Sequence, residues 1–253
     1  MKKISYFVIL ISIFFFSACK KTTKESSGGL TCRMLQSSNS IQNRFFFYDD
    51  NRNIIKVLFV DAAADTEQDN YYYVNGHVAY MIRLYQGTLG DTIYYTYNSD
   101  RYVEVNQYGF KLKYLYNGAG QIVKIENYEG SKLSDYSDYS YDIHGNCTRC
   151  TDYTWSGSTY FPYKITDFEF GDQKNQYPSM GLPPLNSMGA TTAWFFSPNN
   201  ITRMRMQSLG QSNKVVFVYH YSSFNENGYP LEISTTDSLN HIFTIENIQY
   251  LCP

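Results

Sequence analysis

Charged residues are scarce in this chain, and neither sign predominates. Asp, Glu, Lys and Arg make up 17% of the 253 residues, and 21 basic residues stand against 23 acidic ones. An ordinary soluble domain has about a quarter of its residues charged. A protein that binds nucleic acid needs a basic patch or stripe, which this balance does not provide. We therefore expect no nucleic-acid partner.

The sequence also lacks the common catalytic and metal-binding motifs. It has no G-x-S-x-G elbow, no H-E-x-x-H pair, no phosphate-binding loop and no G-x-G-x-x-G turn. The four histidines, His77, His144, His220 and His241, have no spacing typical of a metal site. We therefore expect no catalytic residues, no metal and no cofactor. A pair of glycosidase-type carboxylates stays open as an alternative, because its members need not be close in sequence.

A long apolar run occurs only near the N-terminus. Lys2 and Lys3 precede a mainly apolar segment from Ile4 to Phe16, which is followed by Ser17 and Ala18. A membrane-spanning helix needs about 20 apolar residues, so this run is too short. A basic start, a short apolar run and small residues are typical of a secretory signal peptide. We predict that residues 1–18 are a signal peptide.

Cys19 follows the small residues directly, and this arrangement resembles the lipobox of bacterial lipoproteins. The resemblance implies cleavage before Cys19 and attachment of lipid to that cysteine. The segment after it is polar and ends in two glycines, so we predict a flexible tether over residues 19–30. The protein is then expected in the bacterial cell envelope, anchored to a membrane, with the outer membrane favoured and its periplasmic or surface face left open. An ordinary signal peptide with an incidental Cys19 is the alternative.

Four further cysteines fit an oxidising compartment. Cys32, Cys147, Cys150 and Cys252 allow three pairings, and one of these joins Cys32 to Cys252 and ties the two ends together. The Cys147-x-x-Cys150 spacing is too weak for zinc, because no second pair and no suitably spaced histidine accompany it. Structural or unpaired buried cysteines are the simpler interpretation.

Tyrosine, in contrast, is abundant, with 26 residues, and it recurs in a short repeated phrase. The clearest copies run from Tyr114 to Ile125 and from Tyr139 to Cys150. Each has alternating aromatic residues, a glycine-containing turn and a second strand that carries a cation. Alternation with period two, bounded by turn residues, is typical of β-hairpins. We predict an all-β fold over residues 31–253, a single domain. It is expected to be a meandering, strongly twisted antiparallel sheet of repeated β-hairpins, with at most one short helix near 186–194.

The return strands of these hairpins share a charged fourth position. It is basic in four copies and acidic in two: Lys56, Lys124, Arg149, Arg203, Glu104 and Glu232. We expect these side chains on the solvated face of the sheet, where opposite charges on neighbouring strands attract. Ligand recognition by the same charges is the alternative.

The segment from Tyr139 to Cys150 has the pattern Tyr-x-Tyr-Asp-x-x-Gly-Asn. It resembles the YD repeat of Rhs-type bacterial surface proteins. Together with the lipobox and the irregular repeat spacing, it makes the chain similar to the bacterial envelope lipoproteins of the domain of unknown function 4595 type. This resemblance implies a β-repeat protein of the envelope, and it carries no catalytic residues over.

Four aromatic residues lie in or beside irregular segments and are candidates for ligand binding: Trp155, Tyr160, Tyr177 and Trp194. Exposed Tyr and Trp rings offer flat amphipathic surfaces for sugars or peptides. We therefore predict a lipid-anchored, non-enzymatic binding or scaffolding module for a glycan or an envelope protein. An envelope glycan hydrolase with a carboxylate pair and a purely structural spacer are the two alternatives.

Overall fold

The computed structural model describes residues 32–98, 101–107, 109–175, 177–178, 191–212, 214–237 and 243–252. The predicted signal peptide, Cys19 and the predicted tether lie outside the described residues. Of the segment in which a helix was predicted, residues 191–194 are described. Among the described residues, no helix has the length and apolar character needed to span a lipid bilayer.

The described chain forms sixteen β-strands and one helix. The helix, α1, is short and spans Thr191–Phe196, which overlaps the segment predicted for it. The strands, in chain order, are β1 (Arg33–Ser38), β2 (Gln42–Tyr48), β3 (Ile54–Asp61), β4 (Thr66–Val74), β5 (His77–Tyr85), β6 (Thr88–Asn98), β7 (Arg101–Gln107), β8 (Phe110–Tyr116), β9 (Ile122–Glu129), β10 (Lys132–Tyr141), β11 (Cys147–Trp155), β12 (Tyr160–Lys174), β13 (Asn199–Ser208), β14 (Lys214–Phe224), β15 (Pro230–Asp237) and β16 (Phe243–Leu251).

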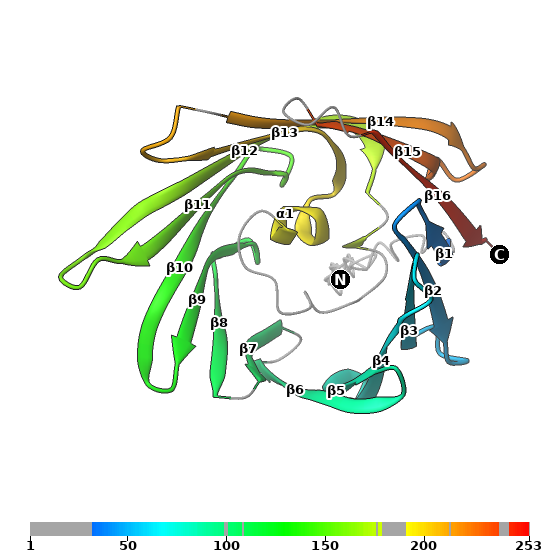
Figure 1. The fold of residues 1–253 in the computed structure, drawn as a ribbon, viewed down its shortest axis with the longest axis horizontal. Helices are drawn as coiled ribbons and strands as arrows, with labels where there is room; N and C mark the ends of the chain where they lie inside the picture. The colour runs from blue at the N-terminus through cyan, green and yellow to red at the C-terminus, as the bar shows by residue number, and fades with distance from the viewer. Residues whose placement is uncertain are drawn as a thin grey trace, which may run out of the picture. The chain divides into compact units, whose positions relative to one another are not determined.

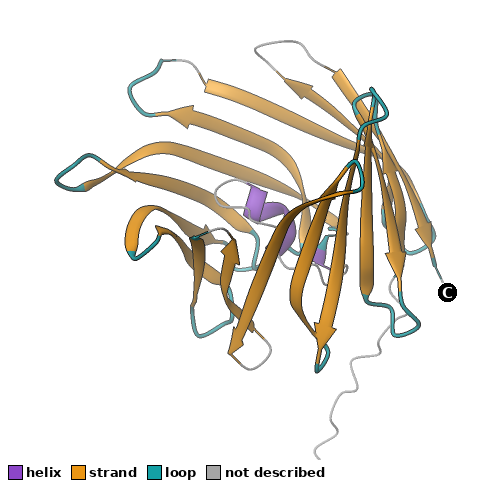
Figure 2. Cartoon of the chain, turned by 60° about the horizontal axis from the view of Figure 1, so that its bottom comes forward, coloured by secondary structure: helices purple, strands orange, loops and turns teal. Residues whose placement is uncertain are grey.

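The strands form a closed antiparallel barrel, with α1 inside the ring of strands (Figure 1). Each strand pairs with its neighbours in the sequence, and loops join the strands at both ends of the barrel (Figure 2). The prediction of an open meandering sheet is wrong, because β1 also pairs with β16, with Arg33 opposite Leu251. Closure leaves no sheet edge with unpaired backbone groups, and this stabilises a barrel relative to an open sheet.

A β-bulge recurs where the return strands begin. The pairing register shifts between Phe47 and Tyr48 on β2, between Leu115 and Tyr116 on β8, and between Ser140 and Tyr141 on β10. An extra residue in one strand bends it and increases its twist. The same bend repeated around the sheet brings the last strand back to the first.

The bulge also changes which side chains face the core. Ile122 and Ile125 are both buried, and so are Cys147 and Cys150, although each pair is three positions apart. On a regular strand such residues would face opposite sides. Cys147 and Cys150 nevertheless both face the core, because one extra bulge residue lies between them in β11.

Tyrosine hydroxyls link consecutive hairpins of the repeat. Tyr141 Oη donates to the carbonyl oxygen of Ile122 at 2.7 Å, and Tyr221 Oη donates to that of Ile201 at 2.7 Å. In each case the acceptor is at or near the start of the return strand of an earlier hairpin. The hydroxyl of the second tyrosine in the Tyr-x-Tyr phrase therefore donates a hydrogen bond to a backbone carbonyl group near the start of that return strand.

The polar residue after this tyrosine forms the turn. Asp142 Oδ1 accepts hydrogen bonds from the backbone N–H groups of His144 and Asn146, at 2.8 and 2.9 Å. Asn117 Oδ1 accepts from Ala119 and Gln121, each at 3.0 Å. Such turns explain why either Asp or Asn serves at this position.

A disulfide joins Cys32, just before β1, to Cys252, just after β16. It lies beside the β1–β16 pairing that closes the barrel. Cys147 and Cys150 are free and buried in the core. The bond therefore connects the two ends of the described chain at the closing pair of strands.

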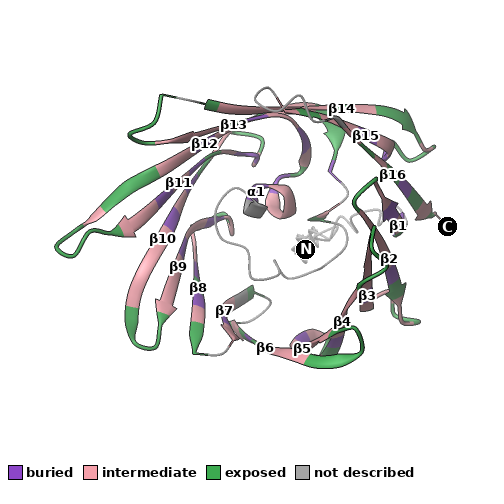
Figure 3. Cartoon of the chain, viewed as in Figure 1, coloured by how far each residue is buried: buried purple, intermediate pink, exposed green. Residues whose placement is uncertain are grey.

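The outer wall of the barrel carries cross-strand ion pairs. Lys124 Nζ lies 3.5 Å from Asp138, and Arg149 Nε lies 2.6 Å from Asp167. Lys124 Nζ also lies 4.0 Å from the centre of the Tyr136 ring. Exposed residues occur on this wall and at the hairpin tips (Figure 3). The charged side chains at the fourth position, such as Lys124 and Arg149, therefore lie on the solvated face of the sheet, as the sequence pattern predicts.

Candidate binding site

A cavity of about 290 Å³ lies between the aromatic side chains of α1 and the inner wall of the barrel. We call it the aromatic cavity. It is lined by Arg44, Tyr177, Trp194, Phe195, Tyr219, Ile233, Thr235 and Glu246. These residues come from β2, β14, β15, β16, α1 and the segment after β12. Ligand sites are usually concave and mainly apolar with a few polar groups, and this lining has that character.

Asn175 holds the aromatic part of the cavity in place. Its side-chain nitrogen donates to the carbonyl oxygens of Trp194 and, at 2.9 Å, Ser197. Its side-chain oxygen accepts from the backbone N–H of Tyr177 at 3.1 Å. Because Asn175 is itself buried, these bonds fix the end of α1 and the position of Tyr177 together.

The aromatic rings meet edge to face. Trp194 and Tyr219 have centroids 4.8 Å apart at 86°, and Tyr177 and Trp194 have centroids 6.1 Å apart at 84°. Phe195 lies 5.5 Å from Tyr177. This is a favourable geometry for aromatic pairs, so the rings keep a fixed arrangement. Burial raises the pKa of Tyr219, and its hydroxyl therefore remains a hydrogen-bond donor at neutral pH.

Two charged side chains complete the lining. Arg44 Nε donates to Gln42 Oε1 at 3.1 Å, and its other guanidinium nitrogens have no hydrogen bond or ion pair within the described residues. Glu246 accepts a hydrogen bond from the Ser37 hydroxyl. Arg44 and Glu246 do not form an ion pair with each other. The cavity therefore offers a donor and an acceptor beside its aromatic rings.

The four aromatic residues predicted from the sequence fall into two separate pairs. Tyr177 and Trp194 lie together in the aromatic cavity. Trp155 and Tyr160 face each other across the β11–β12 hairpin, with centroids 4.9 Å apart, and Tyr160 also contacts Tyr136 at 5.4 Å. These two predicted residues belong to an aromatic cluster on the barrel wall and do not line the cavity.

The sequence does not single out the other six residues that line the cavity: Arg44, Phe195, Tyr219, Ile233, Thr235 and Glu246. Phe195 adjoins Trp194, so a wider window around that tryptophan would have included it. Tyr219 and Glu246 lie on β14 and β16, on either side of β15, and barrel closure through the β1–β16 pairing brings Arg44 on β2 close to them. Among the described residues, no group of three or more metal-ligating side chains occurs.

Solved structures with a similar fold exist, although they are distant in sequence. A porin-like protein from Bacteroides uniformis matches with a TM-score of 0.56 and 10% identity, over 86% of this chain and 96% of that one. A porin-like protein from Bacteroides vulgatus matches with a TM-score of 0.47 and 9% identity, over 87% and 99%. No protein-family model and no curated protein sequence matches the chain. The first match shows that the barrel fold is shared. Membership of the domain of unknown function 4595 type stays a prediction.

Proposed function

We propose that the protein is a lipid-anchored, non-enzymatic binding module of the bacterial cell envelope, and that its ligand places a sugar ring in the aromatic cavity. The arrangement of Trp194, Tyr177 and Tyr219 beside Arg44 and Glu246 carries this proposal. A sugar ring has an apolar face that packs on aromatic rings. Its hydroxyls are both donors and acceptors, and they match a guanidinium and a carboxylate.

The outer wall supports attachment by a lipid instead of insertion of the barrel. Asp167, Glu169, Arg203 and Arg205 lie in the middle of β12 and β13, and their side chains are 39–49% exposed. On the lipid-facing side of a transmembrane barrel, each Arg at the bilayer centre costs about 2–4 kcal/mol. A barrel with these charged side chains on its outer wall is more stable in water than in the hydrocarbon core of a bilayer. Attachment through Cys19 would hold such a barrel at a membrane.

The hydrolase alternative receives less support from the same cavity. Glu246 is the one carboxylate among the described residues that line it. Hydrolysis by the common two-carboxylate mechanism needs a second acid near the first. The spacer alternative does not account for an aromatic cavity with charged groups.

The two tryptophans of the chain provide a direct test, because one lies in the cavity and the other on the barrel wall. In the Trp155→Phe variant, Trp194 is the only fluorescent tryptophan. We expect its emission to change saturably when the full-length protein is titrated with a panel of monosaccharides and disaccharides. The matched Trp194→Phe variant, which reports on Trp155, should show no such change. A flat response of Trp194 to the whole panel would exclude the proposal, and turnover of any glycan would exclude its non-enzymatic part.

A further inference from the structure

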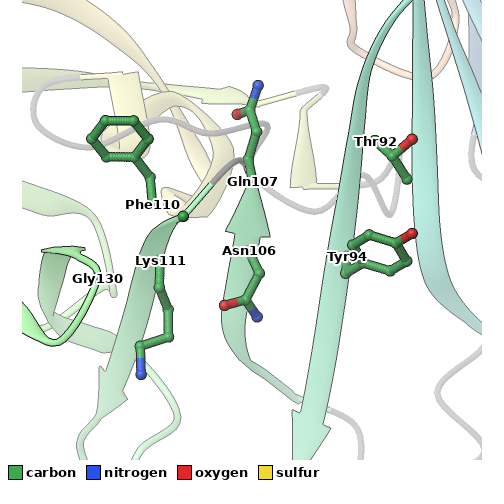
Figure 4. Close-up of a pocket in the computed structure, with 8 residues that line it drawn as sticks. Thr92, Tyr94, Asn106, Gln107, Phe110, Lys111 and Gly130 are labelled. Carbon is green, nitrogen blue, oxygen red and sulfur yellow. The ribbon is translucent and has the colours of Figure 1, made fainter.

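A second hollow, distinct from the aromatic cavity, lies across β6, β7 and β8, and we call it the outer groove. It has a volume of about 590 Å³, larger than the aromatic cavity. It is lined by Thr92, Tyr94, Asn106, Gln107, Gly109, Phe110, Lys111 and Gly130 (Figure 4). Tyr94 is opposite Asn106, and Asn106 is opposite Lys111 in the strand pairing.

The groove is open because small residues form its middle and its rim. The short side chain of Asn106 lies between the longer side chains of Tyr94 and Lys111 (Figure 4). At the rim, the backbone N–H of Gly130 donates to the carbonyl oxygen of Gly109 at 2.9 Å, which joins two hairpin ends. A Cβ atom added at either glycine would have no heavy atom within 4 Å. Access from solvent is therefore unobstructed by these residues.

Aromatic rings in the groove are unusually exposed. Tyr94 is 57% exposed and Phe110 is 51% exposed, the two highest values among the aromatic residues whose burial is described. Leaving such surface in water is unfavourable, and exposed apolar patches often mark interaction sites. The aromatic surface continues beyond the groove, since Tyr80 lies 6.2 Å from Tyr94 and stacks on Tyr72 at 4.6 Å. Three neighbouring strands thus present a row of rings.

Polar groups of the groove are available, and its charges are balanced. The side chains of Thr92 and Asn106 form no hydrogen bond with other described residues, so their donors and acceptors can serve a ligand. Lys111 Nζ lies 3.5 Å from Glu104, and the ammonium group is therefore already paired. A ligand that fits these features has apolar ring faces, many hydroxyl groups and no net charge.

We propose that the outer groove and the Tyr80–Tyr72 row bind a neutral polysaccharide chain. One sugar ring would occupy the groove against Tyr94, with hydrogen bonds to Asn106 and Thr92. Successive rings would follow the tyrosine row across β5 and β4. This site needs no contribution from the aromatic cavity, and the two proposals can fail separately.

Affinity electrophoresis of the full-length protein in mild detergent tests this proposal. Native gels would contain one of four neutral polysaccharides (starch, a β-glucan, a mannan or a xylan) or acidic polygalacturonate. We expect retardation by at least one neutral polymer, weakened about tenfold in Tyr94→Ala, since loss of a stacked ring removes roughly that much affinity. Phe224→Ala removes a 41% exposed aromatic side chain on β14 and should retain full retardation.

The remaining outcomes each decide the question. No retardation by any neutral polymer, retardation by polygalacturonate alone, or equal retardation of Tyr94→Ala and the wild type would overturn the proposal. Equal melting temperatures of the two variants would show that folding is unaffected. If Trp194→Phe abolished retardation while Tyr94→Ala did not, the polymer would bind at the aromatic cavity and the groove proposal would be lost. Loss of retardation in Tyr94→Ala with an unchanged Trp194 response to monosaccharides would support two independent sites.

Discussion

Tyr141 and Ile122 are connected by a hydrogen bond of 2.7 Å from the phenolic oxygen of one to the carbonyl oxygen of the other. The bond links consecutive hairpins, 19 residues apart in the chain. Removing the hydroxyl in Tyr141→Phe leaves that carbonyl without its side-chain donor. We expect the free energy of unfolding to fall by about 1 kcal/mol, measured by urea denaturation. Tyr136→Phe on the outer wall is the matched control and should change stability by less. Equal effects of the two variants would show that the inter-hairpin bond is unimportant.

The buried ion pair of Asp69 and Arg83 should matter more than any pair on the outer wall. Asp69 is fully buried and accepts two hydrogen bonds from Arg83, at 2.7 and 2.9 Å. Asp69→Asn keeps the shape but removes the charge, so we expect a loss of about 3 kcal/mol in chemical denaturation. Asp167→Asn breaks the exposed pair with Arg149 and should cost less than about 1 kcal/mol. A small effect at Asp69 would mean that Glu67, 3.0 Å from Arg83, compensates.

The two free thiols should be unreactive in the folded protein. Burial raises the pKa of Cys147 to about 12 and also raises the pKa of Cys150, so neither is a thiolate at pH 8. Iodoacetamide should modify both only after denaturation, as read by peptide mass spectrometry. Cys32 and Cys252 should react only after denaturation and reduction, because they form the disulfide. Rapid labelling of Cys147 in the native protein would contradict the buried position.

Membrane attachment should depend on Cys19 alone. The Cys19→Ala variant lacks the proposed site of lipid addition, and residues 20–29 of the predicted tether include no apolar residue to replace the lipid. We expect the protein to move from the membrane fraction to the soluble fraction after cell lysis. Loss of the acyl label in the same variant is the accompanying control. A variant that lacks the label but stays with the membrane would disprove lipid anchoring.

The hairpins were predictable because their signals are local. Asp142 and Asn117 mark turns through contacts within four residues, and the alternating aromatics mark the strands. Closure was not predictable from such signals. Closure depends on the pairing of β1 with β16 and on β-bulges. Neither is visible when the strands are read as regular alternation of inward-facing and outward-facing residues. The buried pairs three positions apart, such as Ile122 and Ile125, were the available sign of the bulges.

The candidate site was predictable in part for the same reason. Tyr177 and Trp194 stand out because they lie between β12 and β13, outside the repeated hairpins. Arg44, Tyr219 and Glu246 lie in ordinary strand sequence, and nothing near them distinguishes a lining residue from any other inward-facing one. Barrel closure places Arg44 on β2 near Tyr219 and Glu246 on β14 and β16.

The disulfide between Cys32 and Cys252 covalently links the start of the first strand to the end of the last strand, and this gives the fold the connectivity of a ring. A ring has no preferred starting point. New termini placed at an exposed hairpin tip, such as the Ser156–Thr159 turn, would leave every strand with its two partners once a short linker replaced the disulfide. The barrel should therefore tolerate circular permutation. The order of the strands around the barrel, and not the position of the chain termini, defines the fold.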